Sequence, residues 1–117
     1  MRFDAARKFA LSLPETTEEP HFDMSSFRVK GKIFCTVPPE GGRLHIFTNP
    51  LEGEALVAEN PKGYEHIIWA KQLKSDWLRV YLTHAETAQV KGLLEDAWRM
   101  KAPKRVLAAY DAAHPST

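Results

Sequence analysis

Apolar residues recur along this chain at two different spacings, which separates its helices from its strands. The first group follows the helical spacing of three to four residues: Phe3, Ala6, Ala10 and Leu13. These positions predict a helix over residues 3–12, which ends at Pro14 because the residue before a proline avoids the helical region. Residues 14–22 are acidic and bounded by prolines, and we expect them to form a loop.

The next segment alternates between apolar and polar residues, as a strand does. Phe27 and Val29 alternate with cations, and Gly31 supplies a tight turn, so residues 25–37 are predicted to form a hairpin. After a loop rich in proline and glycine, residues 43–48 alternate again and predict a third strand.

A second helix is predicted to begin at Asn49 and Pro50. The Asn49 side chain can cap the first turn, and proline suits the first helical position. This helix should end before Pro61, and residues 60–66 are expected to form a loop.

Two more strands and two more helices complete the predicted order. The strands are expected over residues 67–73 and 77–82, with a turn at residues 74–76. Thr83 and Glu86 have the spacing of a capping box, which predicts the start of a long helix. An apolar stripe continues this helix to Lys101, and a short helix is expected over residues 103–112. The order predicts a single α+β domain over residues 1–117, with an antiparallel sheet of about five strands and helices on one face.

Composition adds limits on location and size. The 117 residues suit one domain, and the net charge of +1 lacks the strong basicity of a dedicated nucleic-acid binder. Acidic segments at 15–23 and 52–65 nevertheless alternate with basic segments at 27–48 and 71–79, so the surface charge is expected to be uneven. The one cysteine favours a reducing compartment, and no stretch suits a membrane span, so we expect a cytoplasmic protein.

No motif of a catalytic, metal or cofactor site stands out. The five histidines form no metal-binding spacing, and no glycine-rich phosphate loop or nucleophile motif occurs. His21 and Asp23 supply only two possible metal ligands, and Cys35 is expected to be a buried, unreactive thiol. The sequence therefore predicts a protein that is not an enzyme and uses no cofactor.

The strand pattern does predict a binding face. Leu78, Val80 and Leu82 form an aliphatic face of one strand, as Leu44 and Ile46 do in another. The opposite faces combine aromatic and basic side chains: Trp77, Arg79 and Tyr81, with Arg43, His45 and Phe47. Such a face can stack on bases and contact phosphates, or it can anchor a protein partner. Alternatively, these aromatic rings pack on one another and bind nothing.

Two groups of cations are candidates for contacts to phosphates. The tip of the first hairpin carries Arg28, Lys30 and Lys32. The second group consists of Lys71, Lys74 and Arg79. Contacts of this kind provide affinity that depends on salt and is independent of base sequence. The alternative for the hairpin tip is a charged edge that prevents aggregation.

These landmarks together make the chain resemble the MmcQ/YjbR family of small bacterial proteins. The matching segments are Leu13-Pro14, Pro20-His21-Phe22, the hairpin from Phe27 to Phe34, Trp77 with Val80 and Leu82, and Pro103-Lys104. The family often has Ser-Tyr in the long helix, where this chain has Ala97-Trp98.

The resemblance implies a CyaY-like fold, in which helices back a curved antiparallel sheet. It also implies binding of double-stranded DNA through two basic hairpins, a double wing. From the residues alone, a protein-interaction adaptor that uses the aromatic and basic sheet face remains the alternative.

Overall fold

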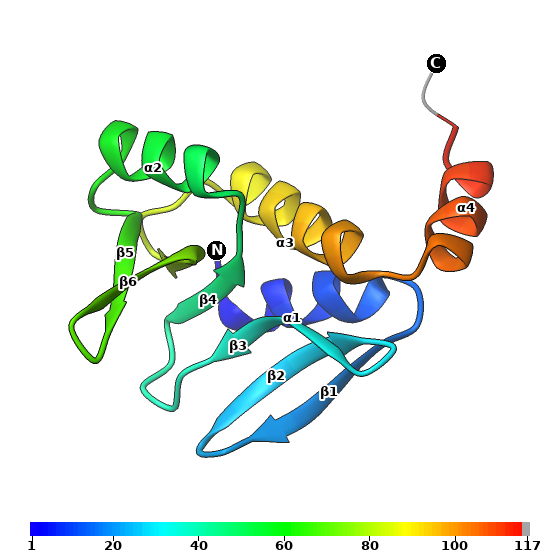
Figure 1. Cartoon of the computed structure of the whole chain (residues 1–117), viewed down its shortest axis with the longest axis horizontal. Coiled ribbons are helices and arrows are strands. Elements are labelled where there is room, and N and C mark those ends of the chain that lie inside the picture. Colours follow the sequence, from blue (N-terminus) through cyan, green and yellow to red (C-terminus); the bar gives the residue numbers. More distant parts are fainter. Residues whose placement is uncertain (116–117) are drawn as a thin grey trace.

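The computed structural model describes residues 1–115, which form four helices and one open antiparallel sheet (Figure 1). The strands are β1 (Thr16–His21), β2 (Met24–Val29), β3 (Lys32–Val37), β4 (Arg43–Phe47), β5 (Tyr64–Trp69) and β6 (Gln72–Tyr81). Their order in the sheet is β1-β2-β3-β4-β6-β5. The helices are α1 (Phe3–Ser12), α2 (Pro50–Glu59), α3 (Thr87–Lys101) and α4 (Lys104–Ala113). The predicted α+β class and the antiparallel sheet are confirmed.

The sheet has six strands rather than about five, because residues 16–21 form β1. The expectation of a loop over residues 14–22 was therefore wrong. β1 pairs with β2 along its whole length, from Thr16 opposite Val29 to His21 opposite Met24. It lies at the edge of the sheet, where a strand tolerates proline and acidic side chains and needs no continuous apolar face.

The hairpin of β5 and β6 also differs from the prediction. Its turn falls at Ala70 and Lys71, both of which have positive φ angles (50° and 65°). Residues 74–76 do not form the expected turn but lie within β6, where the register with β5 shifts. The strand stays attached to the sheet there because the carbonyl oxygen of Asp76 accepts a hydrogen bond from the Thr48 amide at 2.8 Å. The expected loop over 60–66 is shorter, since β5 begins at Tyr64.

The helices follow the predictions more closely, with one correction. α1 matches its predicted range. Asn49 caps α2, because its side chain accepts hydrogen bonds from the backbone amides of Leu51 and Glu52. α3 begins at Thr87 with Glu86 as its N-cap and no side-chain capping bond, so the predicted capping box does not form. The residues just after β6 turn back instead, and the amide of Ala85 donates to the Tyr81 carbonyl.

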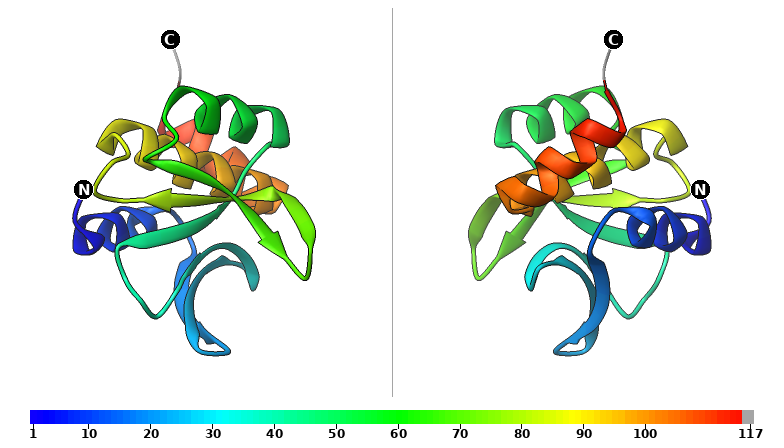
Figure 2. Two further views of the ribbon diagram at one scale, coloured as in Figure 1. Left: turned by 90° about the vertical axis from the view of Figure 1, so that its left-hand side faces the viewer. Right: turned by 90° about the vertical axis from the view of Figure 1, so that its right-hand side faces the viewer.

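The core lies between the sheet and the helices. α3 packs across β2, β3 and β4, α1 packs against α3 and the edge strand β1, and α2 packs against β5 and β6. The largest fully buried side chains include Trp98, Phe27, Phe34, Leu44 and Leu78. Figure 2 shows the β1–β2 hairpin curling at the opposite end of the molecule from α2 and α4, so the sheet is strongly curved. Within the described residues, no helix has the length and apolar character required to cross a bilayer.

Candidate binding groove on the open sheet face

β4 and β6 divide their side chains between two faces as the alternation predicted. Leu44, Ile46, Leu78 and Val80 are buried beneath the helices. The other face carries three cross-strand pairs of partly exposed residues: Arg43 with Tyr81, His45 with Arg79, and Phe47 with Trp77. We call this second face the open face. It contains the four predicted stacking or partner residues, His45, Phe47, Trp77 and Tyr81.

The centre of the open face is a hydrogen-bonded polar row. Arg79 donates through Nε to His45 Nε2 at 3.2 Å and through Nη1 to Glu65 Oε1 at 2.5 Å. The Tyr81 hydroxyl donates to the same Glu65 oxygen at 3.0 Å. Burial, together with the positive charges of Arg79 and Arg43, lowers the pKa of His45 to about 4. The ring is therefore neutral at pH 7, with Nε2 as the acceptor.

A cavity of about 740 Å³ opens over this polar row. Arg43, His45 and Arg79 form its floor, since they project from the middle of the sheet. Its walls come from the β1–β2 turn, the loop between β3 and β4, and Trp69 at the end of β5. A second cavity of about 370 Å³ shares Met24, His45, Trp69 and Arg79 with the first, so the two form one groove.

Large apolar side chains at the rim of this groove face solvent. Phe22 in the β1–β2 turn is 91% exposed, and Trp69 is 71% exposed. Ile68, which lines the second cavity, is 66% exposed. Its cross-strand partner Leu73 is 56% exposed but is not part of the lining of either cavity. The sequence prediction missed Phe22 and Trp69. The available signal was the run Ile67-Ile68-Trp69, whose lack of alternation places apolar side chains on both faces of an edge strand.

Phe47 and Trp77 are less accessible to a ligand than the alternation of the sequence predicted. Their rings contact each other edge to face with centroids 5.5 Å apart. The Lys101 ammonium lies 3.8 Å from the centroid of Phe47. This pair therefore matches the alternative in which aromatic side chains pack on one another.

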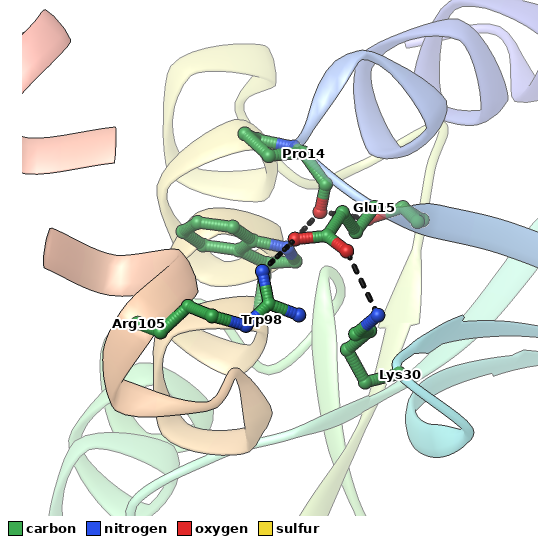
Figure 3. A network of polar contacts seen from close by, with 6 residues as sticks. Pro14, Glu15, Lys30, Trp98 and Arg105 are labelled. Carbon is green, nitrogen blue, oxygen red and sulfur yellow. Dashed lines mark hydrogen bonds and ion pairs between the residues drawn. The ribbon is translucent and has the colours of Figure 1, made fainter. Parts of the chain in front are cut away.

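Two of the three cations in the first predicted group are held against the protein. Arg28 donates to the Ser26 hydroxyl at 3.0 Å and to the Pro20 carbonyl at 3.1 Å. Lys30 forms an ion pair with Glu15 at 2.9 Å, and Glu15 also pairs with Arg105 of α4 at 3.3 Å (Figure 3). The hydrogen bond from Lys30 is the main cause of a lowered Glu15 pKa. Lys32 is exposed.

The second predicted group is divided between two places. Lys71 is exposed at the β5–β6 turn, and Lys74 is partly exposed in the following segment of β6. Arg79 lies in the floor of the groove. Figure 1 shows the β2–β3 turn and the β5–β6 turn on opposite sides of the molecule. The structure thus brings Arg79 together with the open-face residues, but it does not bring the two hairpin tips together.

Trp98, at the position where the sequence differs from the usual Ser-Tyr, has a structural role. Its ring is fully buried, and its Nε1 donates a hydrogen bond to the Pro14 carbonyl at 3.0 Å (Figure 3). This bond ties α3 to the segment between α1 and β1. The residue therefore contributes to the core and not to the groove.

The chain is thus a small α+β domain whose open sheet face carries a partly apolar groove. The model of the YjbR family matches residues 11–100, and the chain therefore belongs to the YjbR family. No curated protein matches the sequence.

Two solved structures share the fold. Protein DR2400 of Deinococcus radiodurans, described as having a DUF419 domain, is 20% identical over 89% of this chain and 80% of its own, with a TM-score of 0.75. A protein from Pseudomonas syringae is 17% identical over 86% of this chain and 99% of its own, with a TM-score of 0.63. At these identities, the likeness is one of fold alone.

Proposed function

We propose that this protein is a non-catalytic adaptor that holds a segment of a partner protein in the groove of its open face. The observation that carries this proposal is the cluster of exposed large apolar side chains, Phe22, Ile68 and Trp69, around one groove. Exposed apolar clusters of this kind mark interaction surfaces, and aromatic residues are frequent anchors of protein interfaces. The buried thiol of Cys35 favours a reducing compartment, and we propose the cytoplasm.

The charges of the groove also favour a protein partner over a nucleic acid. Each guanidinium in the floor already pairs with a carboxylate, Arg43 with Glu40 and Arg79 with Glu65. Asp23 adds another acidic side chain to the lining. A phosphate backbone carries one charge per nucleotide and would meet these carboxylates along its path, whereas a mostly apolar peptide segment would not.

Binding of double-stranded DNA through the hairpin tips is the second candidate function. The observation that favours it is that Lys32, Lys71 and Lys74 form no ion pair with any residue of the range 1–115. Free lysines on exposed turns can contact phosphates. Two observations count against this function: Lys30 is already paired with Glu15, and the two hairpin tips lie on opposite sides of the molecule (Figures 1 and 3).

A displayed library of random peptides, selected on the full chain, would test the adaptor function. We expect the wild-type protein to enrich peptides whose binding is lost in Phe22→Ser and Trp69→Ser. Both side chains are mostly exposed, so their removal should leave the fold intact. Leu51→Ser is the matched control, because Leu51 is 78% exposed but lies on α2, outside the lining of the groove.

Circular dichroism and urea unfolding would establish that the three variants fold alike. Failure to enrich any peptide, or equal losses in Leu51→Ser and the two groove variants, would overturn the adaptor proposal.

A further inference from the structure

The floor of the groove contains two cations that are much less exposed than their carboxylate partners. The side chain of Arg43 is 28% exposed, whereas Glu40, its partner at 3.2 Å, is 62% exposed. The side chain of Arg79 is 24% exposed, and that of its partner Glu65 is 49% exposed. Both cations lie on strands of the sheet, while their carboxylate partners, Glu40 in the loop between β3 and β4 and Glu65 on β5, are more exposed and can yield to another anion.

Both guanidinium groups keep donors for a ligand. A guanidinium has five N–H donors in a planar fork that matches a carboxylate. Contacts within residues 1–115 use Nε and Nη1 of Arg79 and Nη2 of Arg43, and leave the other nitrogens without an acceptor. The neutral His45 between them adds no positive charge, but its Nδ1 carries a proton while Nε2 accepts from Arg79.

We infer that the groove selects a partner segment in which an aspartate or glutamate side chain lies beside large apolar side chains. The inference rests on the adaptor function proposed above. The carboxylate contacts the free donors of Arg43 and Arg79 in the floor, and the neighbouring apolar side chains pack against Phe22 and Trp69 at the rim.

Charge complementarity limits the occupant to one or few negative charges. Asp23, Glu40 and Glu65 outnumber the two guanidinium groups, so a carboxylate binds only by displacing Glu40 or Glu65 from its arginine, and a polyanion is repelled. The apolar rim excludes water around the ion pair, and this strengthens it relative to an exposed one. A phosphodiester chain satisfies neither condition.

Peptides enriched on the wild-type protein would test this selection. We expect them to contain aspartate or glutamate next to aromatic or aliphatic residues. Replacing that acid by asparagine or glutamine in a synthetic copy should weaken binding by about ten- to a hundredfold, the range for a lost charge-assisted hydrogen bond. Arg43→Gln should cause a similar loss for the acidic peptide and little change for the amide copy.

Glu40→Gln provides a change in the opposite direction. It removes the carboxylate that competes for Arg43, so the acidic peptide should bind about two- to fivefold more tightly, as expected for a weak exposed pair. Glu40 is largely exposed in the loop between β3 and β4, and this variant should fold normally. If the Arg43–Glu40 pair were merely structural, Glu40→Gln would not raise the affinity for the acidic peptide.

The outcomes separate this inference from the proposed function. Groove-dependent peptides with no preference for acids, or an unchanged affinity in Glu40→Gln and Arg43→Gln, would overturn the carboxylate inference and leave the adaptor function standing. Displacement of the peptide by a single-stranded oligodeoxynucleotide at equal or lower concentration would also overturn it, because phosphate would then be the preferred anion. If no peptide is enriched, both the carboxylate inference and the adaptor function are overturned.

Discussion

His45 is the residue whose environment makes the clearest prediction. Its charged neighbours are Arg79, Arg43 and Glu40, and burial together with the two cations keeps its pKa at about 4 instead of the usual 6.5. Between these two pH values the unfolded chain binds a proton at His45 that the folded protein does not. Because stability rises with pH wherever the unfolded state binds more protons, the protein should lose stability as pH decreases through this window.

The measurement is the free energy of unfolding in urea at pH 7 and pH 5, for the wild type and for His45→Gln. Glutamine can still accept the bond from Arg79 but cannot take up a proton. The wild type should lose more stability than the variant, by at most about 1.4 kcal/mol per pH unit. Parallel losses in the two proteins would contradict the neutral ring, and a proton resonance of His45 that titrates near its ordinary pKa would do so directly.

Individual residues also show where sequence reasoning succeeds and where it fails. Period-two alternation was enough to assign His45 and Arg79 to the face opposite Leu44 and Val80, because the side chains of a strand alternate by geometry. It could not reveal that Lys30 is paired with Glu15, since that contact depends on how distant turns come together. Phe22 was missed for a related reason: nothing local tells an exposed turn phenylalanine from a buried one.

Among the elements, the β5–β6 turn invites a direct test. Ala70 and Lys71 both have positive φ, as in the type I′ turn that joins two-residue hairpins, and neither residue is suited to that region. Replacing them with Asn-Gly, the pair preferred in this turn, should stabilise the protein by about 1 kcal/mol in urea unfolding. Lys62→Gly serves as the control, because Lys62 is not among the residues with positive φ and glycine there should destabilise.

A decrease in stability for the Asn-Gly variant would mean that the hairpin does not have this turn. The same element explains the wrong prediction of the turn position. Ala-Lys carries no turn signal, whereas Lys74-Ser75-Asp76 does, so the sequence favoured a turn four residues too late. By contrast, Gly31 and Asn49-Pro50 carry strong local signals, and the β2–β3 hairpin and the start of α2 were predicted at the right places.

At the scale of the whole molecule, the arrangement of charge decides between the two candidate functions. Cations and acids are almost balanced, with 16 basic and 15 acidic residues, and the structure pairs several of the cations that a DNA interface would need. Each hairpin tip keeps some free lysine, but the tips point to opposite sides of the molecule (Figure 1). A single duplex would therefore contact one tip and gain few phosphate contacts.

The salt dependence of duplex DNA binding measures the number of those contacts. The logarithm of affinity falls against the logarithm of salt with a slope of about −0.9 per phosphate contact. Three free lysines, Lys32, Lys71 and Lys74, predict a slope no steeper than about −2.7, and contacts from all six predicted residues would give about −5.4. Fluorescence anisotropy of a labelled duplex at several salt concentrations gives this slope.

We expect weak binding at low salt that disappears near physiological salt. We also expect equal losses of affinity in Lys32→Glu and in Lys62→Glu, a control with the same change of charge away from both tips. A slope near −5 that flattens only in Lys32→Glu and Lys71→Glu would instead favour two DNA-binding wings and would count against the adaptor function.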